Sequence, residues 1–198
     1  MLSASALALL QAPPGAASVY VLTPASALTV KTGKAGLLGF AGHEHVIRAR
    51  GFSGRVLYNP HAPDSSSVAV LVPTDSLEVL TPPDTAEIRK VTAAMRSQVL
   101  QIAQYPEIRL ESRAISVRGD TAHVLAALTM HGVTRDVPID VRIEITADTL
   151  RAVTRFVIKQ TDFGIRPYRG GPGGTVRVAN EVTFDIHIVA ARREGNPR

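Results

Sequence analysis

The sequence predicts an all-β domain of about eight antiparallel strands with one amphipathic helix. Apolar and polar residues alternate along most of the chain, and a single stretch repeats its apolar residues at helical spacing. The chain has 198 residues, of which 45% are hydrophobic and 20% are charged. This length and composition suit one folded domain with a substantial core.

The strand pattern is clearest in the second half of the chain. Between residues 137 and 145, apolar residues at odd positions alternate with Asp140, Arg142 and Glu144. Residues 150–159 and 176–188 repeat this pattern, which indicates strands with one buried and one solvated face, as in antiparallel sheets. Less regular strands are expected at Ser18–Thr23, Ala27–Lys34, His45–Tyr58, Ser67–Val72, Glu107–Val117 and His123–Met130.

One helix is expected over about residues 84–102. Pro82 and Pro83 precede Asp84, whose side-chain oxygen can cap the helix. Apolar residues then recur every three or four positions, at Ile88, Val91, Met95, Val99 and Ile102. This spacing gives the helix a single buried stripe. The helix should end before Tyr105-Pro106, because proline restricts the residue before it.

Several strands with one helix, and no alternation of the two, disfavour a parallel α/β sheet. A closed barrel removes the exposed strand edges, and about eight strands leave an interior that side chains fill or that holds one small ligand. The strand pattern alone leaves a barrel and a sandwich open.

The N-terminal segment has the features of an export signal. Leu2 to Leu10 is a short apolar run, followed by the small residues Gly15 and Ala17. We expect residues 1–17 to be a signal peptide, although this segment lacks Lys and Arg and also fits a disordered leader on a cytosolic protein. No other apolar run approaches spanning length, so no membrane span is expected. Residues 193–198 are expected to be a disordered tail.

Charge and composition exclude several functions. The formal net charge is +5, but the basic residues are scattered, and aromatic residues make up only 5% of the chain. Nucleic-acid binding is therefore disfavoured, because single-strand binders need basic grooves with stacking aromatics. The absence of cysteine excludes disulfides and thiolate chemistry.

Two histidine segments are candidates for chemistry. His43 and His45 are two residues apart, so on a strand they point to the same side and could share a metal ion, with His131 as a third ligand. The simpler interpretations are a polar start to a strand or hydrogen bonding to a ligand. His131-Gly132 lies between two expected strands, where Gly132 suits a hairpin turn.

Four segments together resemble one protein family. The stretches ALTMHGVTRDVPIDV, TRFVIKQTDFGI, QYPEIRLES and FSGRVLYNP are similar to those of the YceI-like lipid- and polyisoprenoid-binding proteins, over residues 18–192. The resemblance implies an eight-stranded, lipocalin-like antiparallel barrel closed off by a helix. It further implies an apolar tunnel for an isoprenoid quinone or another lipid, a periplasmic or secreted location in bacteria, and no catalytic residues. The segment QVLQIAQYP departs from the usual pattern, whereas GHEH resembles one subset of the family, and together they leave the ligand's identity open.

The resemblance leads to specific expectations for the site. The side chains expected to line the tunnel are Phe40, Phe52, Met95, Val99, Leu128, Met130, Phe156 and Phe184. His43 and His45 are expected at its polar end. The predicted function is binding of a long apolar amphiphile, as a carrier, storage or stress-related protein, with no covalent cofactor; homodimer formation stays open. The alternative is a metal-dependent enzyme or metal-binding protein that uses His43 and His45.

Overall fold

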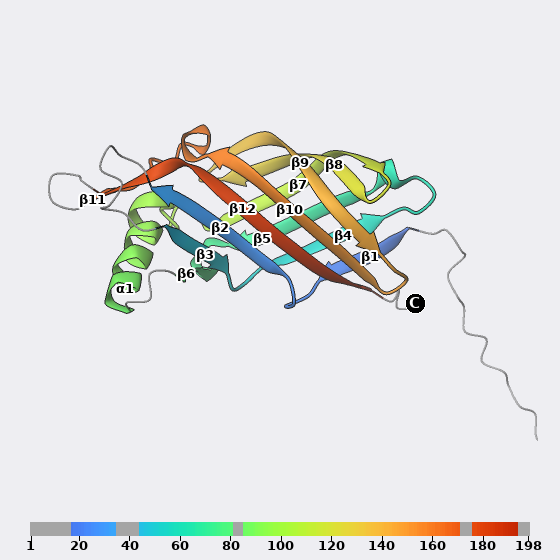
Figure 1. The fold of residues 1–198 in the computed structure, drawn as a ribbon, viewed down its shortest axis with the longest axis horizontal. Helices are drawn as coiled ribbons and strands as arrows, with labels where there is room; N and C mark the ends of the chain where they lie inside the picture. The colour runs from blue at the N-terminus through green and yellow to red at the C-terminus, as the bar shows by residue number, and fades with distance from the viewer. Residues whose placement is uncertain (1–16, 35–43, 81–84, 171–175, 194–198) are drawn as a thin grey trace, which may run out of the picture.

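The computed structural model describes residues 17–34, 44–80, 85–170 and 176–193. The expected signal peptide (1–17) and tail (193–198) lie outside these ranges apart from one residue each, and Phe40, His43 and Asp84 also lie outside them. Figure 1 shows an elongated β-barrel with the helix α1 (Thr85–Ala94) at one end. In the described part of the chain, no helix is both long and apolar enough to cross a bilayer.

The wall of the barrel is built from antiparallel strands. The described residues form β1 (Ser18–Leu22), β2 (Ala27–Lys34), β3 (His45–Ala49), β4 (Ser53–Tyr58), β5 (Ser67–Pro73), β6 (Leu77–Val79), β7 (Glu107–Arg118), β8 (Thr121–Met130), β9 (Val133–Ile145), β10 (Thr149–Lys159), β11 (Arg169–Gly170) and β12 (Val176–Arg192).

Eight of these strands close into a ring. Their order is β1-β4-β5-β7-β8-β9-β10-β12, and β12 pairs back onto β1. Between Val178 and His187, β12 also pairs with β2, with one irregularity between Val178 and Val182, and β3 and β6 continue the wall beyond β2. The eight-stranded antiparallel barrel implied by the family resemblance is therefore confirmed, and the sandwich that the strand pattern left open is excluded.

The β10–β12 pair shows how the alternating pattern produces the barrel wall. The two strands pair without interruption from Thr149 opposite Ala191 to Lys159 opposite Glu181. On β10, the inward residues Leu150 and Ile158 are buried, whereas the outward Arg151 and Lys159 are exposed. Burying the apolar face of each strand stabilises the fold by about 25 cal/mol per Å² of apolar surface removed from water.

One expected strand is divided in two. The sequence predicts a single strand from His45 to Tyr58, but β3 and β4 are separated by a bend at residues 50–52. The Ser76 hydroxyl donates a hydrogen bond to the Gly51 carbonyl oxygen at 2.9 Å and holds this bend. The bend allows β3 to pair with β2 while β4 pairs with β1.

The helix is shorter than predicted and changes its winding. After α1, a π-helical turn runs from Met95 to Val99, in which the Leu100 N–H donates to the Met95 carbonyl at 2.8 Å. The chain leaves the helix at Gln101, whose φ of 48° lies in the left-handed region. The predicted helix over residues 84–102 therefore ends too late. The spacing of apolar residues does not reveal that Gln101 adopts a left-handed backbone conformation, which ends the helix.

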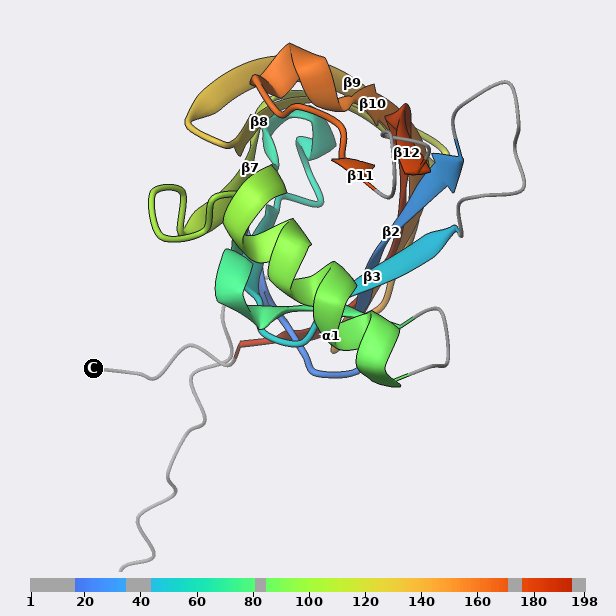
Figure 2. The ribbon, with the colours of Figure 1, turned by 90° about the vertical axis from the view of Figure 1, so that its left-hand side faces the viewer.

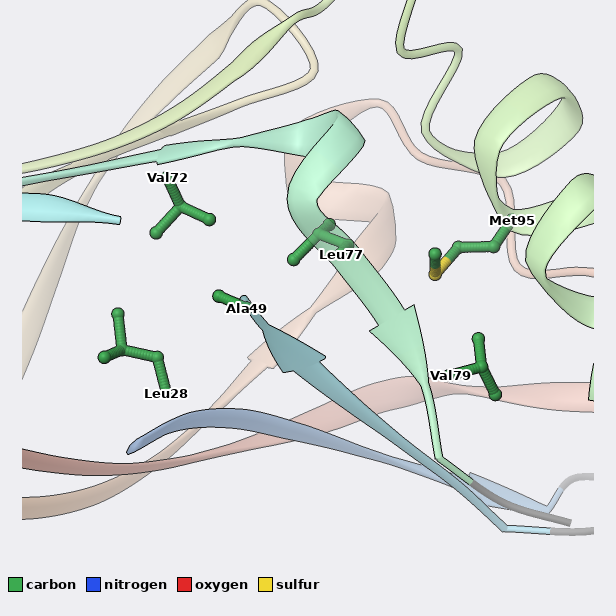
Figure 3. Packing of buried hydrophobic residues seen from close by; sticks show 6 residues of the cluster. All are labelled: Leu28, Ala49, Val72, Leu77, Val79 and Met95. Carbon is green, nitrogen blue, oxygen red and sulfur yellow. The ribbon is translucent and has the colours of Figure 1, made fainter. Parts of the chain in front are cut away.

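The helix lies across one end of the ring of strands (Figure 2). Arg96 Nη2 donates to the Asp75 carbonyl at 2.8 Å and fixes the π turn to the turn between β5 and β6. Beside it, the Met95 side chain reaches toward Val79 and Leu77 (Figure 3). Met95 is only 6% exposed, so the helix contributes to the core at this end.

The β8–β9 hairpin turns at His131-Gly132, as the sequence predicts. Met130 pairs with Val133, and the two residues between them have φ values of 51° and 74°. Positive φ at both central residues is typical of the type I′ turn that suits two-residue hairpins. The Tyr105 ring covers this turn, and a Cβ at Gly132 would lie 2.8 Å from it, so only glycine fits without a shift.

In the described part of the wall, the seam between β9 and β10 is incompletely paired. Their register runs from Ile145 opposite Leu150 to Arg142 opposite Val153, and the described residues of the two strands share no further pair. The hairpin register directs the backbone of Pro138 toward β10, where proline has no N–H to donate. At the end of the paired region, the Thr154 hydroxyl donates to the Asp140 carbonyl at 2.7 Å.

Candidate ligand cavity

A cavity of about 700 Å³ lies inside the barrel at the α1 end. Its walls come from α1, the π turn and strands on several sides of the barrel. The apolar residues that line it are Val30, Ile47, Leu77, Val79, Ala86, Val91, Ala94, Met95, Val99, Leu100, Ile108, Met130, Ile158, Ile165, Val178, Val182 and Phe184. We call this space the helix-end chamber. Its volume lies within the range of about 300–1,000 Å³ that is usual for small-molecule sites.

Polar side chains also border the helix-end chamber. They are Thr32, His45, Glu87, Lys90, Gln160, Tyr168 and Arg177. The His45 N–H donates to Thr32 Oγ1 at 3.2 Å, and Gln160 Nε2 donates to the Ala179 carbonyl at 2.8 Å. The chamber therefore combines an apolar interior with charged and hydrogen-bonding groups from α1 and from the strand ends.

A second cavity of about 210 Å³ lies farther along the barrel interior. We call it the deep chamber. All of its lining residues are apolar except Tyr58, Ser66 and Thr154. A small apolar cavity of this kind holds hydrocarbon more readily than water, because water there finds few hydrogen-bond partners.

The structure distributes the predicted tunnel residues between the two chambers. Met95, Val99 and Met130 line the helix-end chamber, Leu128 and Phe156 line the deep chamber, and Phe184 lines both. Whether these side chains contact a ligand stays a prediction.

Phe52 is placed differently from its predicted position. It lies at the bend between β3 and β4, where it packs against the cluster of Leu28, Ala49 and Leu77, and it lines neither chamber. Phe52 lies between β3 and β4 and in neither strand, so it is not part of the alternating inner face that lines the chambers. Phe40 lies outside the described residues.

The histidines are not gathered into one cluster in the described structure. His45 borders the helix-end chamber, whereas His131 packs on Tyr105 with ring centroids 4.0 Å apart and does not line that chamber. Among the described residues, no group of three or more His, Cys, Asp or Glu side chains could hold a metal ion. The third candidate, His43, lies outside these residues.

Most of the polar border was not predicted from the sequence, although the strand pattern contains part of it. Thr32 and Gln160 continue the inward alternation of β2 and β10 and could have been found from the strand pattern. Gln160 is only 7% exposed, as expected for that position. The positions of Lys90 and Arg177 at this border could not be predicted from the sequence. They lie on a helix and on a strand end, which come together only because α1 docks against the barrel.

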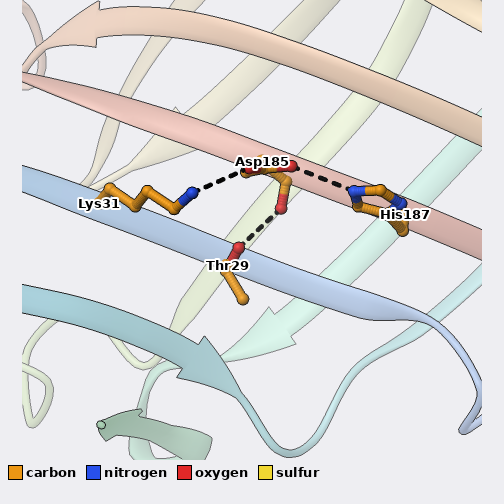
Figure 4. A network of polar contacts seen from close by, with 4 residues as sticks. All are labelled: Thr29, Lys31, Asp185 and His187. Carbon is orange, nitrogen blue, oxygen red and sulfur yellow. Dashed lines mark hydrogen bonds and ion pairs between the residues drawn. The ribbon is translucent and has the colours of Figure 1, made fainter. Parts of the chain in front are cut away.

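The outer wall carries a separate polar network (Figure 4). Asp185 accepts hydrogen bonds from Lys31 Nζ at 3.2 Å, and His187 Nε2 lies 3.2 Å from its other carboxylate oxygen. The Lys31 hydrogen bond is the largest influence that holds the pKa of Asp185 below its ordinary value. This network points away from both chambers and ties β2 to β12.

The protein is a closed antiparallel barrel with internal cavities and a helix across one end. Closed barrels of about eight strands can enclose one small molecule. The chain belongs to the YceI-like family, because the YceI-like domain model matches residues 20–190. No curated protein sequence matches the chain.

Solved structures with this fold come from several bacteria. Burkholderia cenocepacia BcnA has a TM-score of 0.65 at 18% identity, over 85% of this chain and 98% of its own. A polyisoprenoid-binding domain from Saccharophagus degradans, implicated in plant cell wall breakdown, has a TM-score of 0.65 at 14% identity, over 90% of this chain and 100% of its own. The Campylobacter jejuni YCEI protein has a TM-score of 0.59 at 14% identity, over 75% of this chain and 85% of its own. At these identities the likeness shows the fold.

Proposed function

We propose that the protein binds one long-chain amphiphile of the polyisoprenoid or isoprenoid quinone class inside the barrel. The observation that carries this proposal is the helix-end chamber, an apolar space of about 700 Å³ with a polar border. The tail lies among the apolar side chains, and the headgroup lies among Thr32, His45 and Lys90. The polyisoprenoid-binding domain from Saccharophagus degradans, which shares the fold, supports the choice of ligand class.

The energetics favour binding over chemistry at this site. Each CH₂ group removed from water contributes about 0.8 kcal/mol, so a long tail alone can supply the affinity. The polar groups at the border then orient the headgroup. The protein acts in this proposal as a carrier or store of the lipid, without converting it.

We further propose that the protein carries out this function in the periplasm. The support is the apolar run Leu2–Leu10 followed by small residues, which is typical of a signal peptide. Fractionation of the bacterial host, with N-terminal sequencing of the mature protein, tests this point. A full-length chain recovered only from the cytoplasm would contradict it.

Lipid binding is tested by native mass spectrometry of protein purified from its own host, followed by titration of the delipidated protein with ubiquinone. The Met130→Lys variant should lose most ubiquinone binding, because it places a charge in the helix-end chamber, which Met130 lines. Thr129→Lys on the same strand is the matched control, since the Thr129 hydroxyl faces outward, 2.8 Å from that of Thr134. Circular dichroism establishes that both variants are folded.

Wild-type protein that carries no lipid from its host and binds no ubiquinone would refute the proposal. Unchanged ubiquinone affinity in folded Met130→Lys would instead show that the ligand does not occupy the helix-end chamber.

A further inference from the structure

Four side chains stand between the two chambers. Val30, Leu77, Ile108 and Phe184 line both the helix-end chamber and the deep chamber. They come from β2, β6, β7 and β12, which belong to different parts of the barrel wall. We call this set the interior ring.

The largest member of the interior ring is held in place by its neighbours. Phe184 lies directly opposite Phe156 on β10, and the two rings are stacked, with centroids 4.8 Å apart and an interplanar angle of 9°. On its other side, Phe184 lies opposite Val30. Stacked aromatic pairs have a preferred geometry, so Phe156 favours this orientation of the Phe184 ring.

The two chambers differ in what they can accept. The helix-end chamber has a polar border and a volume of about 700 Å³, whereas the deep chamber has about 210 Å³ and an almost wholly apolar lining. An apolar cavity of about 150 Å³ is large enough for benzene, so the deep chamber has room for a terminal hydrocarbon group somewhat larger than that. A headgroup finds few hydrogen-bond partners there to replace water, because Tyr58, Ser66 and Thr154 are the only polar residues that line it.

We propose that the interior ring and the deep chamber together select the ligand by the length of its tail. This inference rests on the proposed function and adds a specificity determinant to it. The headgroup and the first part of the tail occupy the helix-end chamber, and a tail long enough to pass the interior ring gains further affinity from the deep chamber. Each CH₂ that enters contributes roughly fourfold in affinity. Tails that end before the ring gain nothing from the deep chamber.

The test uses geraniol, farnesol and geranylgeraniol, whose tails each differ by one isoprene unit, in calorimetric titrations of the delipidated protein. Ala152→Leu fills the deep chamber, which Ala152 lines from β10. Compared with alanine, leucine fills the space of about three further CH₂ groups. The affinity for the longest of the three alcohols that the wild-type protein binds should therefore fall at least about tenfold. Affinity for geraniol should change less than about twofold.

Ala94→Leu is the matched control, because Ala94 lines only the helix-end chamber. It should lower the affinity for all three alcohols by a similar factor, since all three occupy that chamber. Phe184→Leu provides a second test that does not depend on Ala152→Leu folding. By widening the interior ring it should move the preference toward longer tails.

The outcomes separate the two proposals. Wild-type protein that binds none of the alcohols and no ubiquinone would refute both the proposed function and the tail selection. Binding with the same tail-length profile in wild type and in folded Ala152→Leu or Phe184→Leu would overturn the tail selection alone.

Discussion

Asp185 illustrates how single side chains fasten the outside of the barrel. Its carboxylate accepts a hydrogen bond from Lys31 on β2 and lies beside His187 on its own strand. Its backbone carbonyl accepts a hydrogen bond from the Thr29 hydroxyl at 2.9 Å. One residue of β12 thus connects to two residues of β2, in the region where β2 continues the wall beyond the ring.

Replacing Lys31 should raise the pKa of Asp185. In Lys31→Met the hydrogen bond that contributes most to the lowered pKa is gone, so the pKa should move up toward its ordinary value. A lowered pKa contributes stability that is present above the ordinary carboxyl pKa and is lost as the pH falls through the folded-state pKa. The variant should therefore lose less stability on acidification than the wild type. Carboxyl carbon NMR titration measures the pKa directly.

Lys159→Met is the control for this experiment, because Lys159 lies on the same outer wall but is not among the groups that shift Asp185. An Asp185 pKa that stays unchanged in Lys31→Met would mean that His187 and Arg155 hold it without the lysine.

At the residue level, the strand alternation predicts which side chains face inward but not which of them meet. It places Leu128, Met130, Phe156 and Phe184 in the interior, where the structure has them. The stacking of Phe156 on Phe184 depends on the exact register of β10 and β12. Register arises from pairing between distant segments, which no local pattern contains.

At the level of elements, the seam between β9 and β10 shows how one residue changes a sheet. Pro138 is visible in the sequence, but its consequence depends on the two-residue turn at His131-Gly132. That turn sets which backbone groups face β8 and which face β10. With a turn longer by one residue, Pro138 would interrupt the pairing with β8 instead.

The seam should exchange its amide hydrogens quickly. The N–H groups of Asp136 and Val157 face the seam, whereas those of Val137 and Ile158 face β8 and β12, with which they pair. Native-state hydrogen exchange should therefore be at least about tenfold faster at Asp136 and Val157, because local opening there breaks fewer hydrogen bonds. NMR-detected exchange resolves each amide.

Pro138→Val restores the missing donor and should slow exchange at Val157, where β10 would gain a partner. Equal protection of the seam-facing and the paired amides in the wild type would show that the strands close in solution.

On the scale of the whole molecule, closure depends on β1, which pairs with β4 on one side and with the end of β12 on the other. Tyr20 strengthens this closure from inside, since its hydroxyl donates to the Thr146 carbonyl at 2.9 Å, between β9 and β10. Burial is the largest influence on the pKa of Tyr20 and raises it, so the hydroxyl keeps its proton well into the alkaline range.

A disulfide across this junction should stabilise the barrel. Val21 and Ala191 are register partners with exposed side chains, and the chain has no cysteine of its own to compete. Val21→Cys combined with Ala191→Cys should raise the free energy of unfolding by about 2–4 kcal/mol when oxidised. Urea denaturation with and without reductant measures the difference, and the reduced protein is its own control. Identical midpoints in the two states would mean that the β1–β12 junction already opens without loss of the fold.

The all-β class follows from the sequence because several long strands in the second half repeat the same alternation, so a misassigned position in one strand does not change the result. The choice of a barrel over a sandwich came from the family resemblance. The bend at residues 50–52 and the π turn were missed because each depends on a tertiary contact, with Ser76 and Asp75 respectively. The two chambers likewise depend on tertiary contacts and could not be predicted from the strand pattern. Their apolar linings are visible residue by residue, but the empty space between them depends on how the side chains of opposite walls pack.

Closure by β1 and β12 also has a consequence for biosynthesis. The ribosome makes β12 after every other strand of the ring. One edge of β1 therefore stays unpaired while the strands from β4 to β10 are synthesised. Contacts between such distant segments form slowly, and the nascent barrel exposes its apolar inner face until the last strand docks. The inner surface that later lines the two chambers is therefore the surface that holdase chaperones should recognise during synthesis.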